Sequence, residues 1–521
     1  MDSPWGDEVV AGEYGGHPGL IFERRPRTFA ELLAGVERWS HREFLVQGSR
    51  RITTGQFFAA VAQAREHLRR HGIGPGDRVM LLGHNSPDWV LALWAVWALG
   101  AVPVLGNRWW SVPEAAHSLA LTSPRVVITD TTELASDDTP IVTFADLAGC
   151  FTDASVEGPD IPGPGAEEDP AFILFTSGST GMPKAVELPF RALVANQQNV
   201  LARARQLPHQ IPTDGPQSVT LLSTPIFHIG AFATLITQTL IGGRVIFNVG
   251  RFDPAQVLAL ITSERVQRWG AVPTMAVRLL EHPDFDAYDL SSLRAFPLGG
   301  APVPPVLLER LTLRIPQLQG RGLANTWGMS EGAGFFTLAI GPDLERYPKT
   351  VGRAFATVEL KIADPGEQGS GEILVRSPTL MLGYIGIDDG TIDSEGWLHT
   401  GDLGHLNDDG YLFIDGRSKD MVIRGGENIA CPHVEAVLMR HPDVVDAAAI
   451  GLPHPDLGEE LAAVVIYRTG GRVPTEEDLT QHMTGEVAYF AIPTRWVIRS
   501  EPLPTVGTEK VDKRGLAAEF G

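Results

Sequence analysis

The chain has 521 residues, of which 43% are hydrophobic and 20% are charged, and its formal net charge is −21. An acidic chain of this kind lacks the clustered cations that release counterions from DNA or RNA, which argues against a nucleic-acid-binding protein. The two cysteines, Cys150 and Cys431, exclude a disulfide scaffold or a cysteine zinc cluster and fit a reducing cytoplasm. The length predicts more than one domain.

The first hundred residues contain an amphipathic helix and one long apolar run. Apolar side chains recur at helical spacing within residues 55–72, which predicts a helix with one buried face. Residues 89–105 are apolar enough to suggest a membrane span, but the run is a little short and contains Gly100 and Pro103. A buried helix followed by a buried strand is the better interpretation, so we predict no membrane span. The acidic N-terminus does not resemble a signal peptide.

The pattern of strands and helices divides the chain into two regions. From about residue 50 to 300, short apolar runs alternate with helical patterns, which predicts an α/β fold with largely parallel sheets. From about residue 350, apolar and polar residues alternate between Gly-rich turns, as in antiparallel strands. We therefore predict a large N-terminal domain, residues 1–416, made of α/β subdomains and a small β-rich subdomain. A small α+β domain follows over residues 417–521.

Residues 175–184 read FTSGSTGMPK and follow a buried strand directly. Glycines allow backbone N–H groups to face a ligand, and hydroxyls and an ammonium add donors, so this loop is suited to an anion. Its spacing differs from the G-x-x-x-x-G-K-[ST] loop, because Pro183 stands at the second glycine position and no hydroxyl residue follows Lys184. A flexible surface turn is the alternative, but the entering strand and the Pro-Lys ending disfavour it.

This loop resembles the phosphate loop of the adenylate-forming superfamily, which includes acyl- and aryl-CoA synthetases, luciferases and peptide-synthetase adenylation domains. Further signatures of the superfamily follow in order, so the likeness extends from about residue 25 to 515. The resemblance implies ATP and Mg²⁺ as cofactors, with Thr180 among the magnesium and catalytic residues. It assigns ATP phosphates to Thr176, Ser177, Gly178, Ser179, Thr180, Gly181 and Lys184.

The other signatures imply a base site, a ribose site and an acid pocket. The loop LGGAPVP and the segment NTWGMSE, with Trp for the usual Tyr and Ser for the usual Thr, imply ATP contacts at Gly300, Ala301, Pro302, Asn325, Thr326, Trp327, Gly328, Met329 and Ser330. Glu331 is the implied magnesium ligand and a catalytic residue. Asp402 and Arg417 are implied at the ribose, where a carboxylate suits a vicinal diol. The implied pocket residues are His228, Val272, Gly299 and Gly332, with His228 also placed among the catalytic residues.

The resemblance also implies that the small domain is mobile and rotates about a hinge at Lys419. One orientation brings a lysine to ATP, and the other brings Gly425 and Gly426 to a tunnel for the thiol of CoA, although a tight turn between strands would use the same glycines. The lysine aligns at Lys510, with Lys513 as its rival. Glu509 departs from the glycine usual there, and it either offsets the charge of Lys510 or points to solvent.

These residues together predict an ATP-dependent acid–CoA ligase that forms an acyl adenylate and releases pyrophosphate. A relative of this kind could instead pass its adenylate to a carrier protein or an amine, or activate a small oxyanion such as nitrite. A non-catalytic nucleotide-binding protein of the same fold is the remaining alternative. The expected small-molecule partners are a carboxylic acid, ATP and CoA, and the expected location is the cytoplasm. The sequence does not identify the acid or the oligomeric state.

Overall fold

The structure is a computed structural model that describes residues 3–131, 139–156, 160–177, 182–366, 369–387, 390–417, 421–425, 427–507 and 509–520, without the side chains of Ser177 and Asn428. Six residues of the predicted site therefore lie outside the described residues: Gly178, Ser179, Thr180, Gly181, Lys419 and Gly426.

Two largely parallel sheets form the first part of the chain, as the alternating pattern predicted. The seven-stranded sheet has the order β20-β10-β9-β6-β5-β7-β8, and the five-stranded sheet has the order β13-β11-β12-β3-β4. Strands β9 and β10 pair antiparallel, whereas β9 and β6 are parallel. The first sheet comprises β5 (Arg78–Leu82), β6 (Val102–Leu105), β7 (Val126–Thr129), β8 (Ile141–Thr143), β9 (Pro170–Ser177), β10 (Pro183–Pro189) and β20 (Gly383–Tyr384). The second comprises β3 (Glu43–Gln47), β4 (Arg50–Thr53), β11 (Val219–Leu222), β12 (Arg244–Phe247) and β13 (Arg268–Trp269).

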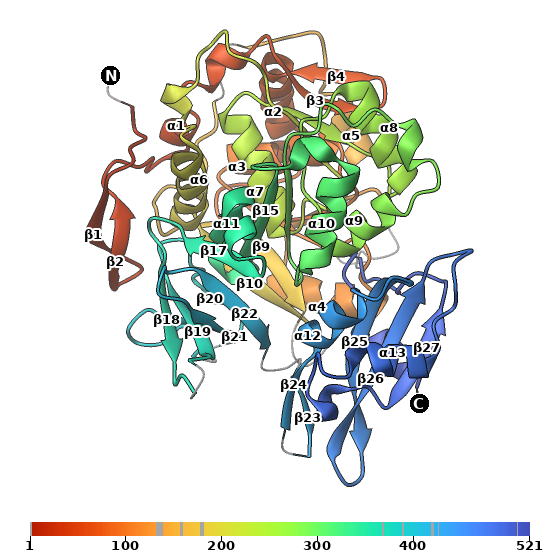
Figure 1. Cartoon of the computed structure of the whole chain (residues 1–521). Coiled ribbons are helices and arrows are strands. Elements are labelled where there is room, and N and C mark those ends of the chain that lie inside the picture. Colours follow the sequence, from red (N-terminus) through yellow and green to blue (C-terminus); the bar gives the residue numbers. More distant parts are fainter. Residues whose placement is uncertain are drawn as a thin grey trace.

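Helices pack between and around these sheets (Figure 1). They are α1 (Phe29–Leu32), α2 (Thr54–Arg70), α3 (Pro87–Ala98), α4 (Val112–Thr122), α5 (Phe144–Ala148), α6 (Phe190–Ala204), α7 (Ile229–Leu240), α8 (Pro254–Glu264), α9 (Pro273–Leu280) and α10 (Pro305–Arg314). The predicted amphipathic helix is α2, which begins with a capping box between Thr53 and Gln56.

The long apolar run is a buried helix and strand, as predicted. Helix α3 has its three tryptophans at 1% exposure or less, and β6 follows it after a turn. The indole Nε1 of Trp97 donates to the carbonyl of Ala171 at 2.7 Å, which ties the helix to β9. Among the described residues, no helix has the length and apolar character needed to cross a membrane.

A mixed eight-stranded sheet follows, in the order β14-β15-β16-β17-β22-β21-β19-β18. Its first pair is parallel and the rest are antiparallel, which agrees with the alternation seen after residue 350. The strands are β14 (Phe296–Gly299), β15 (Leu323–Met329), β16 (Gly334–Ile340), β17 (Thr350–Ala354), β18 (Glu359–Ala363), β19 (Gly371–Arg376), β21 (Leu398–Leu406) and β22 (Leu412–Arg417), with α11 (Gly341–Arg346) between β16 and β17.

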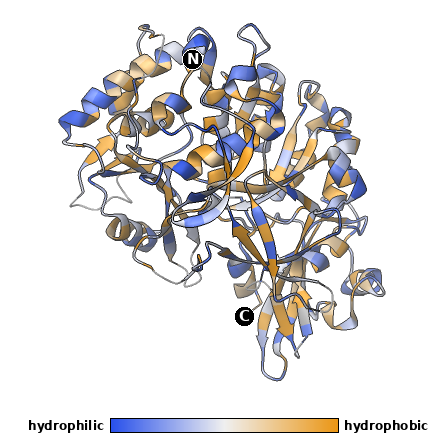
Figure 2. Cartoon of the chain, turned by 90° about the vertical axis from the view of Figure 1, so that its left-hand side faces the viewer, coloured by the Kyte–Doolittle hydropathy of each residue, from blue (hydrophilic) through white to orange (hydrophobic). Residues whose placement is uncertain are grey.

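The C-terminal elements gather at one end of the molecule, coloured blue in Figure 1. Strands β24, β23, β26 and β25 form one sheet in that order, and β27 pairs with β26. These elements are β23 (Met421–Arg424), β24 (Glu427–Ala430), α12 (Cys431–Leu438), β25 (Val444–His454), β26 (Gly458–Tyr467), α13 (Glu476–Met483), β27 (Arg495–Arg499) and α14 (Lys513–Ala518). Figure 2 shows the apolar strands inside this part and inside the larger body.

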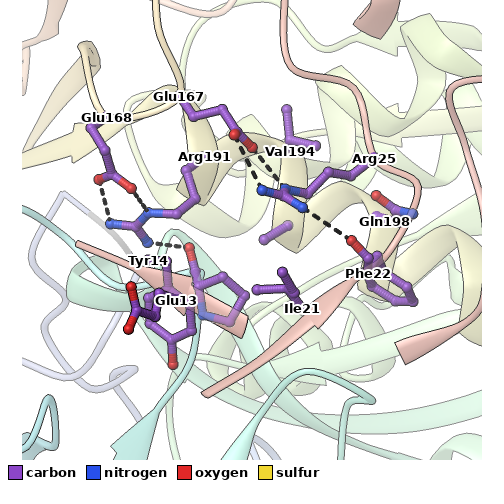
Figure 3. Close-up of a pocket in the computed structure, with 12 residues that line it drawn as sticks. Glu13, Tyr14, Ile21, Phe22, Arg25, Glu167, Glu168, Arg191, Val194 and Gln198 are labelled. Carbon is purple, nitrogen blue, oxygen red and sulfur yellow. Dashed lines mark hydrogen bonds and ion pairs between the residues drawn. The ribbon is translucent and has the colours of Figure 1, made fainter. Parts of the chain in front are cut away.

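The N-terminus adds a hairpin of β1 (Val9–Tyr14) and β2 (His17–Phe22), beside α6. A small pocket lies beneath it, lined by charged residues that pair with one another (Figure 3). Arg25 binds Glu167 at 2.7 Å and Arg191 binds Glu168 at 2.8 Å. The N–H of Gly15, in the turn of the hairpin, donates to Glu168 at 3.2 Å, so this charged cluster holds the hairpin against the body; the pocket contains none of the predicted site residues.

Candidate functional site

The stretch FTSGSTGMPK contains the last residues of β9 and the first residues of β10, and these two strands pair antiparallel. Pro183 pairs with Ser177, and Lys184 pairs with Thr176. Both strands continue into the buried interior of the seven-stranded sheet, because Phe172, Ile173 and Leu174 are all fully buried. The sequence predicted a strand entering this loop; the structure shows that a second strand leaves it, which holds Lys184 beside the strand end.

Tyr384 on β20 links two of the predicted residues. The ammonium of Lys184 lies 4.4 Å from the centre of the Tyr384 ring. The Tyr384 hydroxyl donates a hydrogen bond of 2.7 Å to Oε1 of Glu331, whose side chain is buried. Sequence reasoning did not identify Tyr384, because a Gly-Tyr pair in an apolar stretch carries no motif of its own. It orients the carboxylate that the resemblance assigns to magnesium.

The motifs LGGAPVP and NTWGMSE lie on neighbouring parallel strands, β14 and β15. Gly299 pairs with Thr326, and a Cβ built on Gly299 would lie 2.4 Å from the Thr326 hydroxyl oxygen. This close approach requires glycine. The Thr326 hydroxyl donates to the carbonyl of Leu298 at 3.2 Å, and the Asn325 amide donates to the carbonyl of Thr350 at 3.0 Å. The side chains of Asn325 and Thr326, both predicted ATP contacts, therefore form hydrogen bonds to backbone carbonyls of neighbouring strands.

Asp402 on β21 is a buried carboxylate held by two donors. Trp327 Nε1 donates to one oxygen at 2.7 Å, and Arg417 Nε donates to the other at 2.8 Å. Only 3% of Asp402 is exposed, so the two donors stabilise a charge that would otherwise be costly to bury. The sequence placed all three residues at the nucleotide but did not predict that Trp327 bonds Asp402. The indole itself is largely buried, with its ring 5.3 Å from that of Phe336.

Lys510 reaches this site from the C-terminal end of the chain. A Cβ built on Gly300 would lie 3.6 Å from Lys510 Cε and 4.0 Å from its Nζ. Burial lowers the pKa of Lys510 to about 8. The positive charge of Arg417 lowers this pKa further, whereas the negative charges of Asp402 and Glu331 raise it. The rival, Lys513, binds Glu435 of α12 at 2.7 Å. The structure thus brings Lys510 into the site and holds Lys513 in a separate ion pair.

Glu509 does neither of the things that the sequence suggested. Its carboxylate binds Arg278 of α9 at 2.6 Å and accepts a hydrogen bond from Thr505 at 3.2 Å. Its carbonyl accepts a hydrogen bond from Thr274, and its φ is +57°, in the left-handed region that glycine favours. Glu509 therefore fastens the turn that carries Lys510 to the large N-terminal part of the chain.

Two of the predicted acid-pocket residues lie at the starts of α7 and α9. His228 is the N-cap of α7 and Val272 is the N-cap of α9. Burial lowers the pKa of His228 to about 3, with a further lowering by Lys510, so its imidazole is neutral at physiological pH. Its Nε2 is buried without a partner among the described residues.

Two glycines after Glu331, Gly332 and Gly334, are packed closely against side chains. A Cβ on Gly332 would lie 2.1 Å from the Phe336 ring, and one on Gly334 would lie 2.4 Å from the amide nitrogen of Asn196. Protein side chains, rather than open space, therefore lie beside both glycines.

Several further predicted residues lie in turns or at the ends of strands. Gly425, with a φ of +61°, occupies the turn between β23 and β24, and its N–H donates to the carbonyl of Leu457 at 2.8 Å. Ala301 and Pro302 follow β14, Gly328 and Met329 end β15, and Ser330 begins the 3-10 turn that carries Glu331.

Comparison with known proteins identifies the class of protein. The AMP-binding enzyme family matches residues 32–385, and the AMP-binding enzyme C-terminal domain matches residues 433–510. A feruloyl-CoA synthase from Amycolatopsis sp is 34% identical over 92% of this chain and 96% of its own length. A long-chain-fatty-acid–CoA ligase, FadD13 from Mycobacterium tuberculosis, is 31% identical over 90% of this chain and 93% of its own.

A solved structure of the o-succinylbenzoate CoA synthetase from Bacillus subtilis, in complex with an acyl-adenylate intermediate, has a similar fold. Its TM-score is 0.77 at 26% identity, covering 93% of this chain and 98% of that one. The chain belongs to the AMP-binding enzyme family. It is an AMP-forming ligase of the acyl-CoA synthetase type, and the fold class predicted from the sequence is confirmed.

Proposed function

We propose that this ligase carries out both half-reactions on a carboxylic acid at the site around Gly300, with Lys510 acting in the first. The acid's carboxylate attacks the α-phosphorus of ATP, forming acyl-AMP and releasing pyrophosphate. The thiol of CoA, losing its proton, then attacks the acyl carbon and AMP leaves. The observation that carries this proposal is the convergence of Lys510, Glu331 and Asp402, which are coupled electrostatically although they belong to distant segments.

The chain's own groups have distinct tasks in this scheme. Lys510 stabilises the charge that develops as pyrophosphate leaves, in a site where water is partly replaced by protein. Asp402 accepts hydrogen bonds from the ribose hydroxyls, using the lone pairs that Trp327 and Arg417 leave available. The loop residues 176–181 and Lys184 hold the departing phosphates. Neutral His228 lies beside the acid without adding charge.

Mg²⁺ fits the residues on the inner side of this site. Glu331 is a buried carboxylate whose Oε1 accepts a hydrogen bond from Tyr384, and a hard cation prefers oxygen donors of this kind. Glu331 would hold the ion, with Thr180 as a second predicted ligand. When bound, Mg²⁺ neutralises charge on the ATP phosphates.

The direct test is pyrophosphate release with purified protein, ATP, Mg²⁺ and a panel of aromatic and aliphatic acids. We expect release that depends on the acid, followed by thioester formation that depends on free CoA. If none of the acids in the panel supports pyrophosphate release, the ligase function is overturned. Release with acid but without any use of CoA would favour an amine or carrier-protein acceptor.

The pKa of Lys510 predicts a pH limit on adenylate formation. Because its pKa is lowered to about 8, the ammonium is present below that pH and is lost above it. We expect kcat/KM for pyrophosphate release, which reports the free enzyme, to fall as pH rises through about 8. The rate of thioester formation from supplied acyl-AMP should not fall as pH rises through about 8. A profile that stays flat to pH 10 would contradict the assignment of Lys510.

Removing the charge of Glu509 should weaken adenylate formation selectively. In Glu509→Gln the ion pair with Arg278 is lost while the side-chain size is kept. We expect adenylation to slow roughly twofold to fivefold, as for a partly exposed ion pair, with thioester formation from supplied acyl-AMP unchanged or faster. Arg278→Gln, which removes the other partner of the ion pair, should slow adenylation by a similar factor. The matched control is Arg472→Gln, which breaks an exposed pair within the C-terminal part and should change neither rate.

A further inference from the structure

Trp109 lies in the loop that follows β6, between the two largely parallel sheets. Its ring meets that of His84, after β5, at a centroid separation of 6.0 Å, and that of Phe227, after β11, at 5.5 Å. The guanidinium carbon of Arg251, after β12, lies 5.7 Å from its centre. Strands β5 and β6 are parallel neighbours in one sheet, and β11 and β12 are parallel neighbours in the other. Trp109 therefore lies at the carboxyl ends of strands from both sheets, where open α/β sheets bind their ligands.

Gly507, from the C-terminal part of the chain, lies directly against this ring. A Cβ built on Gly507 would lie 2.6 Å from Trp109 Cε3 and 3.1 Å from both its Cβ and its Cδ2, which is closer than real side chains approach. The φ of Gly507 lies outside the left-handed region, so its own backbone conformation does not require glycine. The contact with Trp109 is therefore what requires glycine at this position.

The turn that contains Gly507 is also the turn that carries Lys510. The N–H of Val506 donates to the carbonyl of Lys510 at 2.9 Å, and the N–H of Glu509 donates to the carbonyl of Val506 at 2.8 Å. Because these bonds close the turn, a displacement of Gly507 displaces Lys510 as well. Helix α9 holds the turn through the ion pair of Glu509, and Trp109 holds it through Gly507. The large N-terminal part of the chain thus contacts the turn at two separate points.

The ring of Trp109 contributes through its shape rather than through its polar atom. A buried indole N–H usually has a hydrogen-bond partner, but Nε1 of Trp109 is buried and has none among the described residues. The side chains that contact the ring from His84, Phe227 and Arg251 all belong to the large N-terminal part, and Phe227 is itself buried. A methyl group added at position 507 should therefore displace the turn rather than the ring.

We propose that Trp109 is a positioning residue for Lys510. Gly507 rests on the Trp109 ring, and this contact sets how far the turn brings Lys510 towards Gly300. The inference rests on the proposed function, because that function assigns Lys510 to adenylate formation. The contact acts while Lys510 is in the site, so its loss should slow adenylation and leave the transfer of the acyl group to CoA unchanged.

Gly507→Ala is the direct test, measured by single-turnover pyrophosphate release with an acid that the wild-type chain uses. The added methyl group needs the space that Trp109 fills, so we expect adenylation to slow roughly 10- to 100-fold, as for a small misplacement of a catalytic group. Thioester formation from supplied acyl-AMP should stay at the wild-type rate, a difference between the half-reactions that a general loss of stability does not produce. Gly149→Ala is the matched control, because Gly149 has a φ of −66° and no atom within 4 Å of an added Cβ. It should change neither rate.

Trp109→Leu should relieve the effect of Gly507→Ala, because the smaller side chain leaves space for the methyl group. Alone, Trp109→Leu should slow adenylation by a smaller factor than Gly507→Ala, since the ion pair of Glu509 still holds the turn. The double variant should adenylate roughly threefold or more faster than Gly507→Ala alone, an interaction of the size found between residues in contact. Thermal unfolding shows whether each variant is folded, and if Trp109→Leu does not fold, the two half-reactions of Gly507→Ala decide the question.

Three results would overturn the assignment of Trp109. The first is a wild-type rate of adenylation in Gly507→Ala, and the second is an equal loss in its two half-reactions. The third is that Gly507→Ala slows adenylation by the same factor whether residue 109 is Trp or Leu. Each of these results leaves the ligase function intact, whereas a wild-type chain that releases no pyrophosphate with any acid would overturn the function itself.

Discussion

Lys510→Ala should lower the rate of pyrophosphate release by about 10²- to 10³-fold, the loss expected when one preorganised donor to the developing charge is removed. Formation of the thioester from supplied acyl-AMP should change little, because no pyrophosphate leaves in that step. The measurement is single-turnover kinetics of each half-reaction with the same preparation of enzyme.

Lys513→Ala is the control for this prediction. Lys513 forms its ion pair with Glu435 within the C-terminal part of the chain, so its loss should leave both half-reactions close to wild type. Equal losses in the two half-reactions of Lys510→Ala would contradict a role confined to adenylation. A large adenylation defect in Lys513→Ala would move the catalytic role to that residue.

Asp402→Ala should lower kcat/KM for ATP by about 10²- to 10³-fold. The change removes the proposed acceptor of both ribose hydroxyls and leaves the Trp327 indole N–H without its partner, and each hydrogen bond to a charged group contributes about 1.5–3 kcal/mol. The value is measured by initial rates at varied ATP with saturating acid.

Trp327→Phe separates the nucleotide contact from the support of Asp402. It keeps an aromatic ring but removes the N–H donor, so we expect a loss of about tenfold or less, as for one hydrogen bond to a charged group. Thermal unfolding of both variants shows whether the fold is kept. An unchanged KM for ATP in a folded Asp402→Ala enzyme would exclude Asp402 from the nucleotide site.

Much of the fold could be predicted from local patterns. The spacing of apolar residues predicted α2, and the apolar run that contains Gly100 and Pro103 was correctly interpreted as a buried helix and strand. The change from parallel to antiparallel strands after residue 350 was also correct. These features depend on side chains a few residues apart, which is the range over which periodicity reports burial.

The contacts among the site residues could not be predicted in the same way. Tyr384 bonds Glu331 across 53 residues, Trp327 bonds Asp402 across 75, and Arg278 binds Glu509 across 231. A motif shows that a residue type is present, but the partner depends on which strands and helices become neighbours. Tyr384 and Arg278 carry no local signal that would have identified them.

The sequence by itself determined the family of this protein, and it predicted the chemistry of the site: a phosphate-binding loop, two carboxylates for a metal and a ribose, and a lysine near the C-terminus. Only the tertiary structure decided that Lys510 rather than Lys513 enters the site. It also decided that Glu509 binds Arg278 instead of Lys510. The physical reason is that charge pairing and burial are properties of surfaces in contact, and those surfaces form only when distant segments pack together.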